Sequence, residues 1–60
     1  MIDAAGQTAV VLGLGASGLA MARALAAGGA QVRVADTRAE PPMLAALRAE
    51  LPQVSFAGGP

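Results

Sequence analysis

The chain has 60 residues, of which four are basic and four are acidic, so its formal net charge is zero. It contains no cysteine and no histidine, which excludes disulfide scaffolds, the common zinc sites and histidine-dependent catalytic triads. All four basic residues are arginine and Phe56 is the single aromatic residue, so the chain lacks the basic surface and stacking platform that nucleic-acid binding needs. We therefore expect no nucleic-acid partner, no metal site and no catalytic residue within these 60 residues.

The first predicted strand is the short apolar run Thr8–Leu12, which lies between Gly6 and Gly13. Because this run is apolar on both faces, it is typical of a parallel sheet that is covered on both sides. The uncharged stretch from Ala4 to Ala22 has the length of a membrane span, but its glycines disfavour a continuous helix. We expect no membrane segment, and the absence of cysteine favours a reducing, cytoplasmic location.

A helix is predicted from Ser17 to Ala27. Its small and apolar residues recur at helical spacing, which predicts that one face carries Gly18, Met21, Ala22 and Leu25. Gly28 and Gly29 should end this helix, because a glycine just past a helix end can adopt the left-handed conformation that satisfies the last carbonyls.

The second half of the chain predicts a strand, a helix and a short strand. Residues 31–36 alternate between apolar and polar positions, which indicates a strand. The pair Pro41-Pro42 can open a helix, whose apolar face would carry Leu44, Leu47 and Leu51. Pro52 would end that helix, and residues 54–56 would form the third strand.

The predicted order is therefore β-α-β-α-β, which indicates an α/β fold and half of a Rossmann-like parallel sheet. Right-handed crossovers that step in one direction place both helices on the same face of such a sheet. The opposite face would be bare, although the first strand is apolar on that side too. We therefore expect the chain to be a fragment of a larger domain, whose remaining polypeptide covers the bare face.

The segment from Gly13 to Gly18 has the pattern G-x-G-x-x-G, directly after a predicted strand and at the start of a predicted helix. In this context Gly13 permits a tight turn, Gly15 lets a phosphate approach the backbone, and Gly18 lets the helix pack on the strand. The amides and the positive dipole end of the helix N-terminus favour an anionic diphosphate. The motif therefore predicts nucleotide binding.

Asp36 ends the second strand 18 residues after Gly18, where dinucleotide folds place a carboxylate beside the nucleoside. Its charge disfavours NADP, because it would repel a 2′-phosphate. In the competing interpretation the glycines only make a turn, and Asp36 with Thr37 caps the next segment. Ser17 is interpreted as a helix-capping or phosphate-facing hydroxyl. Arg38 is either a solvated loop charge or a cation placed over a base or phosphate.

Three segments together resemble the N-terminus of the D-glutamate-adding branch of the Mur ligase family. They are residues 10–18 (VVLGLGASG), the segment 34–38 (VADTR) and the pair Pro41-Pro42. The glycine loop alone is shared with many dehydrogenases, whereas its combination with Asp-Thr-Arg and Pro-Pro is more particular. The resemblance runs over nearly all 60 residues.

This resemblance implies that residues 1–60 are the N-terminal part of a Rossmann-like domain that binds the uridine diphosphate of UDP-N-acetylmuramoyl-L-alanine for peptidoglycan synthesis. Transferred by motif position, the diphosphate-facing loop would comprise Gly13, Gly15, Ala16, Ser17 and Gly18. Asp36, Thr37 and Arg38 would surround the uridine. Family members often carry a bulkier residue at the position of Ala16.

The resemblance also implies that the complete enzyme is an ATP-dependent, magnesium-dependent amide ligase, whose central ATP-binding domain and C-terminal domain are absent from this chain. No cofactor site is expected within these residues. Two alternatives remain open on the sequence. One is an NAD-binding half-domain of a dehydrogenase or redox-sensing regulator, with Asp36 on the adenosine ribose. The other is a structural piece of a doubly wound sheet that binds nothing.

Overall fold

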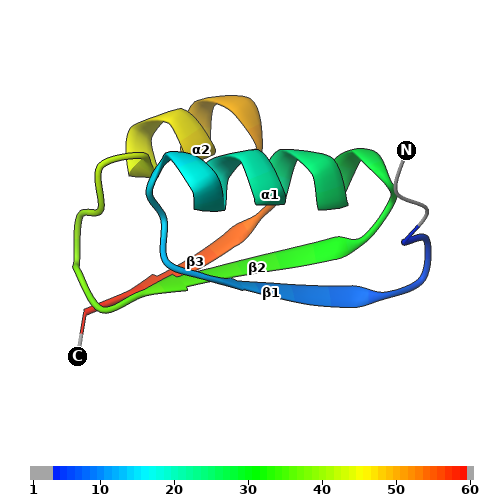
Figure 1. Cartoon of the computed structure of the whole chain (residues 1–60), viewed down its shortest axis with the longest axis horizontal. Helices are drawn as coiled ribbons and strands as arrows, with labels where there is room; N and C mark the ends of the chain where they lie inside the picture. Colours follow the sequence, from blue (N-terminus) through cyan, green and yellow to red (C-terminus); the bar gives the residue numbers. More distant parts are fainter. Residues whose placement is uncertain (1–3, 60) are drawn as a thin grey trace.

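The computed structural model describes residues 4–59, which form a three-stranded parallel sheet and two helices (Figure 1). The elements in chain order are β1 (Thr8–Leu12), α1 (Ala16–Ala27), β2 (Gln31–Asp36), α2 (Leu44–Glu50) and β3 (Ser55–Gly58). The strands lie in the order β1-β2-β3, with Thr8 opposite Gln31 and Arg33 opposite Ser55. The predicted β-α-β-α-β fold is confirmed.

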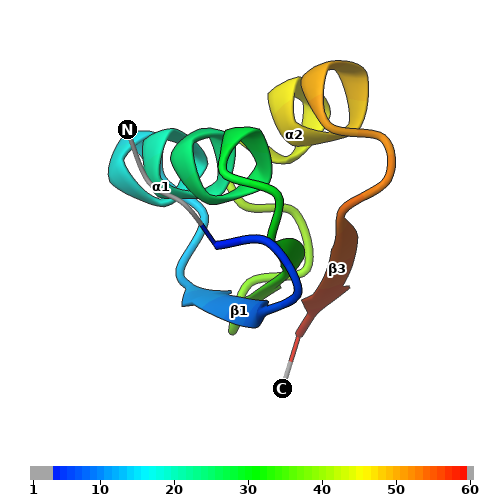
Figure 2. The same cartoon turned by 90° about the vertical axis from the view of Figure 1, so that its right-hand side faces the viewer.

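Both helices cover the same face of the sheet, as the crossover rule predicts (Figures 1 and 2). Val11 of β1 points toward the helices and is buried, whereas its neighbours Val10 and Leu12 point to the other face. These two side chains are 60% and 83% exposed. The bare apolar face that the sequence predicts is therefore present.

The core lies between the sheet and the helices. Its buried members come from all parts of the chain except β3, and they are Val11, Leu14, Leu19, Ala22, Val32, Val34 and Leu47. The predicted core face of α1 is partly wrong, because Met21 is 53% exposed and Leu19 takes the buried position. The helix is rotated so that Leu19 and Ala22 face the strands, and Met21 lies beside the bare face of β1.

The end of α1 follows the prediction. Gly29 has the left-handed φ of +94°, and its amide donates to the carbonyl of Ala26 at 3.0 Å. The amide of Ala30 donates to the carbonyl of Leu25 at 3.1 Å, which completes a Schellman motif. Among the elements of residues 4–59, neither helix combines the length and the apolar character that crossing a bilayer requires.

The predicted bounds of the second helix and the third strand are wrong, and α1 begins at Ala16, one residue before the predicted start. The second helix does not open at the prolines, because Pro41 accepts a hydrogen bond from the amide of Leu44 in a turn and α2 begins at Leu44. A residue before proline is disfavoured in the helical region, which explains why Pro41 stays outside. The third strand begins at Ser55 and continues to Gly58, since pairing with β2 extends until Gly58 lies opposite Asp36.

Candidate functional site

The carboxyl ends of all three strands meet at one end of the sheet, together with the loop before α1 and the loop before α2 (Figure 1). A depression of about 830 Å³ lies there. Four predicted site residues line it, namely Gly13, Asp36, Thr37 and Arg38. Ligands of open α/β sheets bind outside the carboxyl ends of the strands, so this is the expected place for a nucleotide.

The three glycines of the motif have different surroundings. Gly13 has a φ of +92°, which strongly favours glycine, and its amide donates to Ala35 at 2.8 Å. A Cβ atom on Gly18 would overlap the carbonyl oxygen of Gly13, so α1 packs directly on the turn. Gly15 is the N-cap of α1 and faces open space, which leaves its backbone accessible to a ligand. The tight turn at Gly13 and the close packing at Gly18 are as predicted, whereas the approach of a phosphate to Gly15 stays a prediction.

Ala16 and Ser17 are the first two residues of α1 and are exposed. Ser17 does not cap the helix, because the N-cap is Gly15 and no side chain bonds the first turn. That half of its interpretation is wrong, while a phosphate-facing hydroxyl stays a prediction. Ser17 and Gly18 line a separate depression of about 350 Å³ beside Val10 and Met21. The structure therefore does not gather the whole loop around the larger depression.

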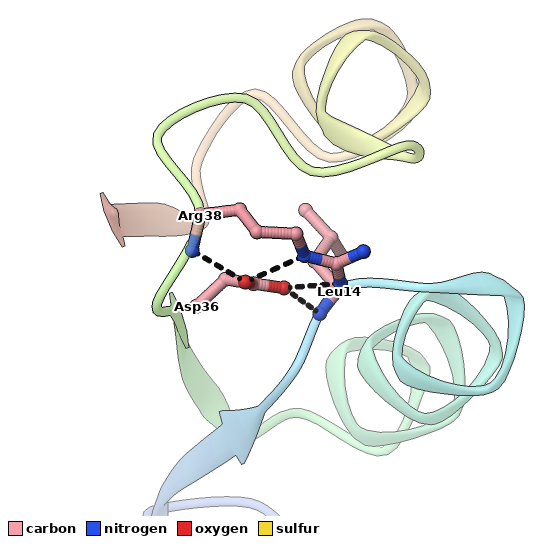
Figure 3. A network of polar contacts seen from close by, with 3 residues as sticks. All are labelled: Leu14, Asp36 and Arg38. Atoms are coloured by element: carbon pink, nitrogen blue, oxygen red, sulfur yellow. Dashed lines mark hydrogen bonds and ion pairs between the residues drawn. The ribbon is translucent and has the colours of Figure 1, made fainter. Parts of the chain in front are cut away.

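Asp36 connects the two loops at this end of the sheet (Figure 3). Its Oδ2 accepts hydrogen bonds from the amide of Leu14 at 2.8 Å and from Nη2 of Arg38 at 2.7 Å. Its Oδ1 accepts from the amide and the Nε of Arg38, at 2.8 and 2.9 Å. The hydrogen bond from the Arg38 amide closes a local turn, as expected if Asp36 caps the segment that follows it. The hydrogen bond from the Leu14 amide instead joins residues that are 22 positions apart in the sequence.

These contacts set the ionisation of the carboxyl group. The guanidinium of Arg38 holds the pKa of Asp36 well below its usual range, and the amides of Arg38 and Leu14 act in the same direction. Burial opposes them only partly, although the Asp36 side chain is just 3% exposed. In turn, the carboxylate raises the pKa of Arg38, whose side chain is 53% exposed. The pair is therefore fully ionised near neutral pH.

Two contributions to the site are not predicted from the sequence. The backbone amide of Leu14 is a donor to Asp36, and no side-chain pattern identifies such a group. The end of β3 also lines the depression, through Ala57, Gly58 and Gly59. A Cβ on Gly58 would lie 2.7 Å from the carbonyl oxygen of Arg38, so this glycine lets β3 approach the site loop. Gly58 and Gly59, at the end of the third strand, are a usable signal in the sequence, since strand ends gather at ligand sites.

The residues that the structure describes were compared with the usual features of metal and ATP sites. No group of three or more acidic or other metal-ligating side chains comes together within residues 4–59. The chain also has no lysine and no G-x-x-x-x-G-K-[ST] segment, which are the usual means of holding a nucleoside triphosphate.

Comparison with known proteins gives concordant matches. A family model described as the N-terminal domain of MurD-like Mur ligases matches residues 7–59. The UDP-N-acetylmuramoylalanine–D-glutamate ligase of Albidiferax ferrireducens is 62% identical over 53 residues, which cover 88% of this chain and 10% of that protein. The ligase of the same name from Ralstonia nicotianae is 59% identical over 58 residues, covering 97% of this chain and 12% of that protein. The chain thus spans about a tenth of the length of the curated relatives that it matches.

Proposed function

Because this chain belongs to the family of MurD-like Mur ligase N-terminal domains, we propose that it forms part of the uridine-nucleotide site of a D-glutamate-adding ligase. The relatives carry names that pair UDP-N-acetylmuramoylalanine with D-glutamate. In this proposal the complete enzyme uses ATP and Mg²⁺ to form an amide bond in peptidoglycan synthesis. We propose that ATP and the metal bind elsewhere in the complete enzyme, since residues 4–59 bring no group of metal ligands together and the sequence has no phosphate-binding G-x-x-x-x-G-K-[ST] segment.

The observation that carries the proposal is the depression at the carboxyl ends of the strands, where Gly13 meets Asp36, Thr37 and Arg38. We propose that the uridine lies there, next to Thr37 and Arg38. The diphosphate then lies toward Gly15 and the first turn of α1, where an uncovered backbone and the positive dipole end favour an anion. Ala16, Ser17 and Gly18 complete this loop.

The contribution of these residues to the reaction is binding and orientation. Holding the nucleotide end of a long substrate fixes the position of its distant carboxylate. Because the substrate is then already ordered when it reacts, less entropy is lost in the reaction step and the barrier at the carboxylate is lower. No residue of this chain is proposed to take part in bond making or breaking. A role limited to binding and orientation agrees with the absence of histidine, lysine and cysteine from the sequence.

We also propose that other parts of the complete polypeptide cover the face that carries Val10 and Leu12. Both side chains are large, apolar and mostly exposed, and they lie beside the half-exposed Met21. A contiguous apolar surface of this kind usually marks a contact. A cytoplasmic location of the complete ligase stays a prediction from the absence of cysteine.

Calorimetric titration of the complete ligase tests the nucleotide assignment. UDP, UDP-N-acetylmuramoyl-L-alanine and NAD are compared at one salt concentration. We expect both uridine ligands to bind and NAD to show no saturable binding up to millimolar concentration. Micromolar binding of NAD without binding of UDP would overturn the proposal and favour the dinucleotide-binding alternative.

A further inference from the structure

Among the strands that the structure describes, the bare face of the sheet carries one charged side chain, that of Arg33. Its neighbours Val32 and Val34 are buried under the helices, so Arg33 points to the opposite face, where it is exposed. It lies on the central strand β2, opposite Val10 of β1 and Ser55 of β3. Figure 2 shows that no element of the described chain covers this face.

The bare face changes in polarity along the strands, with Arg33 at the change. The row of side chains on the carboxyl side of Arg33 is apolar and consists of Leu12, Ala35 and Ala57. The row on its amino side is polar and consists of Thr8 and Gln31. A segment that packs on this face must therefore be apolar over one half and polar over the other.

Arg33 has no hydrogen-bond or ion-pair partner among residues 4–59, whereas Arg23 and Arg38 are each paired with a carboxylate. Adjacent strands of a sheet lie only about 5 Å apart, so a segment that packs on Val10 also removes water from Arg33. Burying an arginine without an opposite charge is strongly unfavourable. A cover of the bare face must therefore supply the partner that this chain does not provide.

We infer, on the basis of the cover proposed above, that the segment of the complete ligase that lies on the bare face presents a carboxylate to Arg33. A guanidinium and a carboxylate form two parallel, charge-assisted hydrogen bonds, which are stronger than bonds to a neutral acceptor. The same segment places apolar side chains over the row that begins at Leu12. The ion pair fixes the orientation in which the cover docks, because only one orientation meets both halves of the face.

Urea unfolding of the complete ligase between about pH 7 and pH 4 tests the pair. The variants are Arg33→Met, which removes the charge, and Arg33→Lys, which keeps it. Arg48→Met is the matched control, since Arg48 is an exposed arginine on α2, and the helices lie on the opposite face of the sheet. Circular dichroism verifies that each variant is folded, and Arg33→Gln replaces Arg33→Met if the methionine variant does not fold.

We expect Arg33→Met to raise the equilibrium constant for unfolding by about 100-fold or more at pH 7, because it leaves a buried carboxylate unpaired. Burial raises the pKa of that unpaired carboxylate, so the variant regains stability relative to the parent as the pH falls and the group is protonated. The difference between parent and variant should therefore shrink on acidification. Arg33→Lys should lose less than about 10-fold, and Arg48→Met should change the constant by no more than about 2-fold.

Three other results would overturn the inference. A loss in Arg33→Met that does not vary with pH would mean that the arginine only packs against the cover. If Arg33→Met is silent while Leu12→Thr destabilises the complete ligase, the cover exists but the guanidinium reaches past it into water. If both variants are silent, the proposed cover itself fails, so the two failures are distinguishable.

Carbodiimide coupling of the Arg33→Lys variant locates the partner. The 60 residues contain no lysine, so the new amine is the only lysine amine of this segment. The reagent activates a carboxylate, and a neighbouring amine then forms an amide with it without a spacer. Peptide mass spectrometry should show position 33 joined to an acidic residue outside residues 1–60, and Arg48→Lys should not give that peptide. The inference would be overturned by coupling of position 33 to the acidic residues of this chain, which are Asp3, Asp36, Glu40 and Glu50.

Discussion

Gly18 lies so close to Gly13 that a Cβ atom on Gly18 would overlap the carbonyl oxygen of Gly13. The first and third glycines of the motif therefore form one packing contact, in which the first turn of α1 lies on the tight turn after β1. Gly15, between them, has open space around it. The fold requires two of the glycines and leaves open space at the middle one, where we propose that the diphosphate lies.

Gly18→Ala should destabilise the fold. Overpacking costs about 1–3 kcal/mol, and the better helix propensity of alanine returns at most about 1 kcal/mol. We expect a net loss of about 1–2 kcal/mol, because the overlapping atom belongs to the backbone and cannot rotate away. Urea denaturation of the 60-residue chain measures the change. An unchanged urea midpoint would show that α1 can move away from the turn without loss.

Gly15→Ala should have the reverse effect. Its φ of −96° suits any residue and its Cβ would meet no protein atom, so stability should change by less than about 0.5 kcal/mol. The added methyl group would occupy the space proposed for the diphosphate. We expect UDP to bind the variant of the complete ligase at least 10-fold more weakly, a loss of about 1.4 kcal/mol or more. Uridine, which has no diphosphate, serves as the control ligand and should bind as it does to the parent.

Elements with a clear period or a clear breaker could be predicted from the sequence. β1 and β2 have the predicted bounds, and α1 ends where the two glycines place its end. The start of α2 could not be read as well, because proline suits both a first helical turn and the turn that precedes α2. The buried position of Leu19 depends on how α1 is rotated on the sheet, and small residues on every side of that helix leave its rotation undefined in the sequence.

For the candidate site, too, one part could be predicted from the sequence and another part could not. Spacing along the chain brought Asp36 to the strand end beside Gly13, where the structure places it. What spacing could not predict is the internal bonding of Asp36, since the donor from Leu14 is a backbone amide 22 residues away. The contribution of β3 was missed because its register with β2 depends on pairing across the sheet.

The stability that Asp36 provides should depend on pH. Its pKa is lowered in the folded state, so its contribution is fully present above the ordinary carboxyl pKa of about 3.9 and is lost as the pH falls toward the folded value. The difference in melting temperature between the parent and Asp36→Asn should be constant above about pH 5 and should shrink between about pH 4 and pH 2. A difference that grows on acidification would contradict the sign of this shift. Because Arg38 is half exposed, added salt should weaken the contribution in part.

The apolar face of β1 should contribute to stability only in the complete ligase. Leu12 is 83% exposed in this chain, so Leu12→Thr should change the stability of the 60-residue chain by no more than about 0.5 kcal/mol. If the rest of the complete ligase covers this face, the same change there buries a hydroxyl and removes apolar contacts. We then expect a loss of about 2 kcal/mol or more, seen as a lower urea midpoint.

A matched control comes from Ala49→Ser, because Ala49 is exposed on α2 and the helices lie on the opposite face of the sheet. This variant should be nearly silent in both contexts. Equal small effects of Leu12→Thr in the short chain and the complete ligase would mean that the face stays open to water, and the proposed cover would be refuted. A large loss of stability confined to the complete ligase would support the proposed cover, because in the short chain no other polypeptide packs on that face.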